Sequence, residues 1–463
     1  MKRALCIALV MVMVIALAAC GGNQGQAPAT TGTNAATTTA AEKTPEQSAP
    51  SGKEITLRFM GPETLGSPAY DFIMEAIDKF EVDNPNIKIE PDLIASADLR
   101  TKITVEMAAG NPPEISSCII SYAREFARDN KIEDWQPIID ANPEFLEWMG
   151  PKIIDNMRDD KGRVLTMPYD ASIDGLYYNT EIFNKYGWQP PKTFDDMIDL
   201  AKKAKAEGIS LLVAGGKDIR FAWLASALMA GVAGKEKTDA LTIGDKKDQW
   251  NNPEYGFVTA MTKFKQLVDA GAYPAGVLGL STNEADQAFA RGEAAMYYEG
   301  AWKPANFVTA GGQEFVDKLE RINFPAFTDC PDGDPAIRVG GNIWGLMIPV
   351  GLDQETKDAA IKFAKVRAGP ELGAKIMEGG NGVYAGTCDY DKTKVLKIFN
   401  QCIEAYRNAP AYMYSMDSYA PPSVDLAIKQ TAMPGIISGE YDVDKAVAEV
   451  QKAAEDYLKT LKK

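Results

Sequence analysis

The alternation of strand and helix patterns where the body of this chain begins constrains its fold more than any other feature. Residues 54–60 alternate polar and apolar side chains, as a strand does, and Gly61-Pro62 ends the pattern. A helical pattern follows, with Ser67 expected as its cap, and it ends at Asn84-Pro85. A strand at 87–90, a helical pattern around 99–107 and a strand at 114–120 complete the series. This order predicts a mostly parallel sheet in a layered α/β fold.

Histidine is absent from all 463 residues, and that absence removes whole classes of chemistry. Neither a Ser-His-Asp nor a Cys-His nucleophile can form, nor a His-containing zinc site or an HExxH protease. The 49 Lys and Arg against 64 Asp and Glu give a net charge of −15, which argues against nucleic acid. We therefore favour binding without catalysis, and we expect no cofactor and no metal.

The first 19 residues have the pattern of an export signal. Lys2 and Arg3 precede an apolar run over 4–19, which falls short of the roughly 20 residues that span a bilayer and has no charged stop-transfer cluster after it. The box Leu17-Ala18-Ala19-Cys20 resembles that of bacterial lipoproteins, in which the cysteine is diacylated and becomes the first residue. We expect lipid on Cys20 to hold the protein at a membrane surface without spanning it.

Residues 20–52 are expected to form the lipidated cysteine and a flexible linker, because 21–52 contain no large apolar side chain that could offset the entropy of ordering. The ordered body should begin near Lys53. Its four cysteines are widely spaced and contain no CxxC pair, which makes a zinc or redox site unexpected. Sequence leaves open whether they are free thiols or form one or two disulfides; they are Cys118, Cys330, Cys388 and Cys402.

Four segments of the body have a recognisable order. A helix that ends at Gly110 leads into Asn111-Pro112-Pro113-Glu114, and Met167-Pro168-Tyr169 precedes the aromatic run 175–179. Residues 288–302 and the glycine-rich 339–345 follow. Together these segments resemble the extracellular solute-binding lipoproteins of carbohydrate ABC importers, the family that includes maltose-binding protein. The resemblance covers nearly all of 53–463, although Glu114 stands where that family usually has Asp.

The resemblance implies a two-lobed periplasmic-binding-protein-like fold of type II, with the ligand in a cleft between lobes that crossing strands join. One lobe would hold 53–168 and 345–397, and the other 169–344 and 398–463. It also implies hinge closure on a sugar or oligosaccharide and delivery of that ligand to ABC permease subunits in the membrane. We expect the binding protein itself to be a monomer.

Pyranose rings present flat C–H faces ringed by hydroxyls, so a sugar site needs aromatic planes and planar polar groups. Trp302 follows a strand and the turn Glu299-Gly300-Ala301, which places its ring at a sheet edge. Trp344 lies in the glycine-rich return crossing, and Trp223 lies on a helical pattern. The other four tryptophans have helical or turn contexts and are expected to be structural: Trp135, Trp148, Trp188 and Trp250.

The polar partners that position favours are Glu63, at the carboxyl end of the first strand, and Asp170, at the first crossing. Glu299 and Asn342 join them from the two later segments. Weaker candidates are Tyr122, Tyr384 and Asp417.

Two alternatives to sugar capture stay open. The first is a binding protein for a polyol or a peptide; an anion is disfavoured because no basic cleft pattern is present. The second is a secreted glycosidase with paired carboxylates, which needs no histidine, although sequence places no such pair. The acidic run 329–334 lacks the twelve-residue calcium loop pattern and predicts an ordinary turn.

Overall fold

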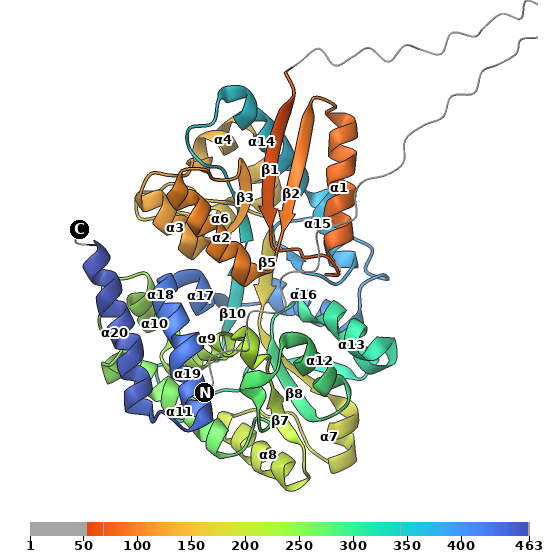
Figure 1. The fold of residues 1–463 in the computed structure, drawn as a ribbon. Coiled ribbons are helices and arrows are strands. Elements are labelled where there is room, and N and C mark those ends of the chain that lie inside the picture. The colour runs from red at the N-terminus through yellow and green to blue at the C-terminus, as the bar shows by residue number, and fades with distance from the viewer. Residues whose placement is uncertain (1–52, 68, 343, 462–463) are drawn as a thin grey trace, which may run out of the picture. The chain divides into compact units, whose positions relative to one another are not determined.

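The computed structural model describes residues 53–461 apart from 68 and 343, and Figure 1 shows their arrangement. The predicted signal at 1–19, the lipidated Cys20 and the linker to 52 lie outside the described residues. Among the residues that are described, no helix combines the length and the apolar character that crossing a bilayer requires.

The opening strands form a five-stranded sheet in the order β2-β1-β3-β11-β4. β1 is parallel to both β2 and β3, as the sequence predicts, while β11 returns antiparallel to β3 and β4. Helix α14 packs beside β1, and α1 packs beside β2 and α14. The bounds are β1 Ile55–Gly61, β2 Ile87–Leu93, β3 Ile115–Ile119, β4 Met167–Pro168, β11 Trp344–Met347, α1 Tyr70–Asp83, α2 Ser96–Ala109 and α14 Gln354–Arg367.

The expected cap of α1 at Ser67 is wrong. The amide of Ser67 donates to the carbonyl of Thr64 at 2.8 Å, and the Tyr70 amide donates to Ser67 at 3.0 Å. These bonds make a turn ahead of the helix, so α1 starts later and Ala69 holds the N-cap position.

A second sheet, in the order β7-β8-β6-β9, carries the other large group of helices. β6 lies antiparallel to β8 and β9, and β7 lies parallel to β8. The strands are β6 Gly175–Asn179, β7 Ser210–Val213, β8 Ala294–Glu299 and β9 Leu319–Ile322. The helices that follow them in this part of the chain are α7 Thr180–Tyr186, α8 Phe194–Ala206, α9 Phe221–Val232, α10 Gly234–Thr242, α11 Phe257–Asp269, α12 Thr282–Ala290 and α13 Lys303–Asp317.

A third sheet, β12-β5-β10-β13, joins the first two. β5 continues from β4 of the first sheet toward β6 of the second, and β10 lies antiparallel to it. Gly340 and Gly341 have φ of 147° and 117°, values that favour glycine, and a Cβ on Gly340 would lie 2.3 Å from the Ser172 carbonyl oxygen. The close approach of the two crossing strands therefore needs a glycine at position 340. The strands are β5 Asp170–Ile173, β10 Ile337–Asn342, β12 Val383–Tyr384 and β13 Ala411–Met413.

Further helices cover these sheets. They are α3 Ile120–Arg128, α4 Trp135–Ala141, α5 Glu144–Met149, α6 Pro151–Asp155, α15 Pro370–Glu378, α16 Lys397–Arg407, α17 Met416–Tyr419, α18 Pro422–Ala427, α19 Met433–Ser438 and α20 Val443–Leu461. One π-helical turn, η4 Ile428–Ala432, connects α18 and α19. Short 3₁₀ turns occupy Gly216–Asp218, Pro253–Tyr255 and Val277–Gly279.

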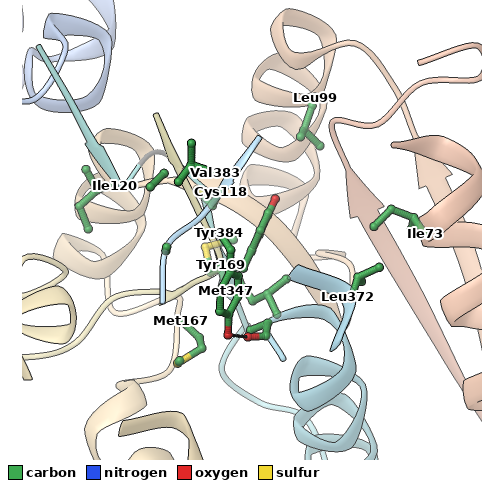
Figure 2. Packing of buried hydrophobic residues seen from close by; sticks show 14 of the residues in the cluster. Ile73, Leu99, Cys118, Ile120, Met167, Tyr169, Met347, Leu372, Val383 and Tyr384 are labelled. Carbon is green, nitrogen blue, oxygen red and sulfur yellow. Dashed lines mark hydrogen bonds between the residues drawn. The ribbon is translucent and has the colours of Figure 1, made fainter. Parts of the chain in front are cut away.

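Buried apolar side chains form two clusters. One surrounds the first sheet, where the ring of Phe363 meets those of Phe59 and Phe80 edge-on, and it extends to α12, α13 and α16. The other fills the space between the second sheet and α8, α9, α11 and α20. Figure 2 shows part of the first cluster, with Cys118, Met347 and Tyr384 among the packed side chains. All four cysteines of the described residues are free thiols, which settles the alternative that sequence left open.

Candidate functional site

Trp302 and Trp223 meet beside a single guanidinium group. Trp302 precedes α13, and Trp223 lies in the first turn of α9. Their ring centroids are 5.8 Å apart at 63°, and the Arg220 Cζ lies 4.6 Å from the Trp223 ring and 5.8 Å from the Trp302 ring. Two half-buried indoles and a cation thus share one place.

The turn before Trp302 explains its position. A Cβ on Gly300 would lie 2.2 Å from Cζ3 of the Trp302 ring, so only glycine lets the indole lie back over the turn. The buried Nε1 of Trp302 has no hydrogen-bond partner among the described residues. A buried indole N–H without a partner is a donor that a ligand oxygen would satisfy.

Glu299 ends β8 with a fully buried carboxylate. Its Oε1 lies 3.4 Å from the Arg220 Nε, in an ion pair whose geometry leaves both atoms without a hydrogen bond. Burial acts to lower the pKa of Arg220, but Glu299, Tyr297, Asp286 and Asp218 together outweigh it and the pKa is raised. Two polar atoms without a hydrogen bond, Arg220 Nε and Glu299 Oε1, therefore lie in an ion pair beside the two indoles.

A second cation lies beneath Trp223. The Nζ of Lys429, on the π-helical turn η4, lies 5.3 Å from the Trp223 ring centroid. The same Nζ lies 2.6 Å from Asp425 and 3.8 Å from Asp417, and all three side chains are buried. Single π-turns often occur at functional sites, and here the turn holds a buried lysine between two carboxylates and an indole.

Asp417 also reaches the first half of the chain. Its Oδ2 lies 3.2 Å from Arg100 Nη2 on α2, and Ser121 Oγ on α3 donates to its carbonyl at 2.9 Å. Burial acts to raise the pKa of Asp417, but Lys429 and Arg100 lower it to about 2. Arg100 in turn lies 5.9 Å from the ring of Trp344, so this predicted residue joins the same network.

Glu63, Asp170 and Tyr384 form a separate group around Arg367. Glu63 is ion-paired with Arg367, whose Cζ lies 3.6 Å from the ring of Tyr169. Burial raises the pKa of Asp170 to about 8 although Arg367 acts to lower it. Tyr384 pairs with Asp170 across β12 and β5, and its hydroxyl donates to the Ala368 carbonyl at 2.7 Å. This buried tyrosine already has its partner (Figure 2).

The two remaining candidates lie at the crossing and on α3. The backbone of Asn342 pairs with Ala171 in the crossing sheet, while its side chain lies outside the described part of the chain. Tyr122 is half-buried on α3, and burial raises the pKa of its hydroxyl to about 12.

The side chains that sequence reasoning missed are the ones that connect the candidates: Arg100, Arg220, Asp425 and Lys429. Arg220 could have been found, because it stands three residues before Trp223 at the start of the same helical pattern. Asp425 and Lys429 stand four residues apart, a spacing typical of an ion pair on a helix. Arg100 carries no local signal, because its partner Asp417 lies far along the chain.

Two carboxylates of the acidic run 329–334 form ion pairs with lysines of neighbouring helices. Asp329 pairs with Lys263 at 2.6 Å and Asp332 with Lys237 at 2.8 Å. Within the described residues no group of three or more Cys, Asp or Glu side chains is arranged to hold a metal ion.

Sheets joined by crossing strands, with tryptophans and paired charges gathered from both halves of the sequence, define a two-lobed α/β protein of the type II periplasmic solute-binding class. The family model described as bacterial extracellular solute-binding protein matches residues 66–374. The chain belongs to that family.

Similar proteins agree with this assignment. A structure from work on xylan utilization by the thermophilic bacterium Caldanaerobius polysaccharolyticus is 26% identical, with a TM-score of 0.77 over 86% of this chain and 99% of that one. An uncharacterized ABC transporter extracellular-binding protein of Pyrococcus horikoshii is 28% identical over 54% of this chain; the match spans 57% of that relative's length. The sn-glycerol-3-phosphate-binding periplasmic protein UgpB of Shigella dysenteriae is 26% identical over 68% of this chain and 71% of its own.

Proposed function

We propose that this protein is the substrate-binding component of an ABC importer that captures a sugar or oligosaccharide outside the membrane and delivers it to the permease. Family membership and the relatives named above support the transport role. Two lobes would move relative to each other when the ligand binds, and β5 and β10 would join them. One lobe would contain 53–168 and 345–397, and the other would contain 169–344 and 398–463.

The observation that carries the sugar assignment is the pair Trp223 and Trp302 beside the Arg220–Glu299 ion pair. The indoles provide apolar planes for C–H faces, and the open hydrogen-bonding positions of the ion pair suit hydroxyls. The unpartnered Trp302 N–H adds a further donor. The similar structure from work on xylan utilization agrees with a carbohydrate ligand.

The relation to a glycerol-phosphate-binding protein raises a phosphorylated solute as a second candidate. Arg100, Arg220 and Lys429 could attract a phosphate, but each is already neutralised. Glu299 pairs with Arg220, and Asp417 and Asp425 balance Arg100 and Lys429. The charge balance therefore favours a neutral ligand.

Calorimetry against mono- and oligosaccharides, including xylose and its oligomers, tests the proposal. We expect one class of sugar to bind and Trp302→Ala to weaken its binding by about 5-fold or more, since one aromatic contact plus its buried area is worth roughly 1–3 kcal/mol. Trp148→Ala, which removes a half-buried indole packed on Phe145, is the matched control and should leave affinity unchanged. Binding of a polyol, a peptide or glycerol 3-phosphate in place of every sugar would show the assignment to be wrong.

The protein would bind its ligand without altering it. Incubation with labelled oligosaccharides should return them intact. Release of shorter products that depends on Glu299 or Asp170 would instead establish the glycosidase alternative.

The predicted lipid anchor on Cys20 has its own test. Mass spectrometry of the mature N-terminus should find a diacylated Cys20, and Cys20→Ala should release the protein from the membrane fraction. A gel-filtration mass near that of one chain would agree with the expected monomer.

A further inference from the structure

A cavity lies apart from the tryptophans, on the α9 side of the second sheet. Its walls are the C-terminal half of α9, the 323–335 segment, the start of β10, Tyr298 of β8 and Asp174 between β5 and β6. Its empty volume is about 480 Å³, which includes space open to solvent. None of the side chains that form the tryptophan site lines it.

The walls combine aromatic rings with polar groups. Tyr298 meets Phe324 edge-on at 5.6 Å, and Phe324 stacks on Phe327 at 5.9 Å. Asn323 and the half-buried Arg338 add amide and guanidinium groups. Such a mixture of apolar rings and convergent polar groups is typical of pockets that bind small polar molecules.

Asp174 is the unusual member of the lining. It is 6% exposed, and its Oδ2 has no hydrogen-bond partner among the described residues. Burial, together with the nearby carboxylates of Glu299 and Asp417, raises its pKa well above the ordinary value. The unpartnered Oδ2 of this buried carboxyl is a hydrogen-bonding position that a ligand hydroxyl would satisfy.

The 323–335 segment holds the cavity in a fixed shape. A Cβ on Gly231 would lie 2.2 Å from the ring of Phe327, so the ring rests directly on the α9 backbone. The ion pairs of Asp329 with Lys263 and of Asp332 with Lys237 fasten the same segment to α11 and α10.

Size and charge restrict the occupant. The enclosed part has room for on the order of three water molecules. An anion would meet the carboxylates of Asp174 and Asp334, and a cation would meet Arg338 with Arg321 close by. A purely apolar molecule would leave these polar groups without partners.

We propose that this cavity is a second solute site, which takes a neutral polyhydroxy molecule of about the size of glycerol. Its hydroxyls replace the enclosed waters and bond to Asp174, Asn323 and Arg338, while its C–H groups contact Phe324 and Phe327. The site touches both crossing strands, because Asp174 directly follows β5 and its amide donates to the Val339 carbonyl of β10 at 2.9 Å.

Saturation-transfer NMR with glycerol as the probe tests the site on the purified mature protein. We expect binding in the wild type, a loss of at least 10-fold in Asp174→Ala and in Arg338→Gln, and no change in Trp302→Ala. Because Trp302→Ala removes the site of the proposed sugar, the two proposals succeed or fail separately.

Thermal unfolding of each variant provides the folding control. Arg338 is only half-buried, so Arg338→Gln decides the test if Asp174→Ala does not fold. No glycerol signal in the wild type overturns the proposal, and so does a signal that survives Arg338→Gln or disappears in Trp302→Ala.

Discussion

At the scale of single residues, the site depends on charges placed under aromatic rings. Arg220 contacts both indoles of the Trp223–Trp302 pair, and Lys429 lies under one of them. Each cation has a buried carboxylate partner, because an unpaired charge in that position would lose most of its hydration without compensation. The carboxylates therefore hold the rings in place indirectly, through the cations.

Glu299→Gln should destabilise the fold by about 3 kcal/mol, because it leaves Arg220 without its buried partner. The value is at the low end for a buried pair since the Arg220 side chain is 22% exposed. Chemical denaturation measures the change.

Glu293→Gln, six residues earlier, is the matched control. Its partner Arg291 and its own side chain are both 56% exposed, so it should cost less than about 1 kcal/mol. Equal losses for Glu293→Gln and Glu299→Gln would contradict the role given to Glu299.

Asp170 should make stability depend on pH. Burial raises the pKa of its carboxyl to about 8 from 3.8, so the folded state holds a proton that the unfolded state releases. Its contribution is fully present below pH 4 and is lost as the pH rises through 8. The free energy of unfolding should therefore fall across this window in the wild type, and Asp170→Asn should flatten that part of the profile. A variant whose profile keeps the wild-type slope would contradict this assignment.

At the scale of elements, the four-residue helix α17 is the meeting point of the network. It places Asp417 against Arg100 of α2 and against Lys429 of the π-helical turn. Ser121 at the start of α3 holds the same residue through its carbonyl. So short a helix has little stability of its own, and its position follows from these side-chain bonds and from the packing of its buried residues.

Asp417→Asn should cost about 2 kcal/mol at pH 7, because the pKa of Asp417 is lowered to about 2 from 3.8. A carboxylate with a lowered pKa stabilises the fold above its unfolded value and loses that effect as the pH falls through the folded value. The unfolding free energies of the wild type and the variant should thus converge near pH 2.

Asp78→Asn provides the comparison, since Asp78 is an exposed residue of α1. It should change stability by no more than about 0.5 kcal/mol at either pH. A difference between wild type and Asp417→Asn that persists at pH 2 would mean that packing, not charge, causes the loss.

At the scale of the whole molecule, stability comes from two large apolar clusters and from no disulfide among the described residues. Cys118 is 3% exposed and Cys402 is fully buried, while Cys330 and Cys388 are partly exposed. Burial raises the pKa of the Cys118 thiol to about 12 and that of Cys388 to about 11, so few thiolates exist at neutral pH.

Mass spectrometry after thiol labelling should find Cys118 and Cys402 unmodified in the folded protein and all four thiols modified in denaturant. Reductant should leave the melting temperature unchanged. A thiol pair that resists labelling in denaturant until reductant is added would show a disulfide and contradict the structure.

Sequence by itself determined the order of strands and helices, the α/β class and the resemblance to a solute-binding family. Those signals are local: side-chain periodicity, glycine and proline at element ends, and short motifs such as the one around Trp302. The sequence also singled out Trp223, Trp302 and Glu299, which the structure brings to one place.

Tertiary structure decided which side chains connect those residues. Arg100 and Asp417 form an ion pair across 317 positions, and Arg220 at the start of α9 pairs with Glu299 at the end of β8. Such partners carry no periodic signal, because only the folded chain brings their distant segments together. Tertiary structure also decided the pKa values of the buried carboxyls. The pKa is raised to about 8 at Asp170 and lowered to about 2 at Asp417, because the charges around the two buried groups differ.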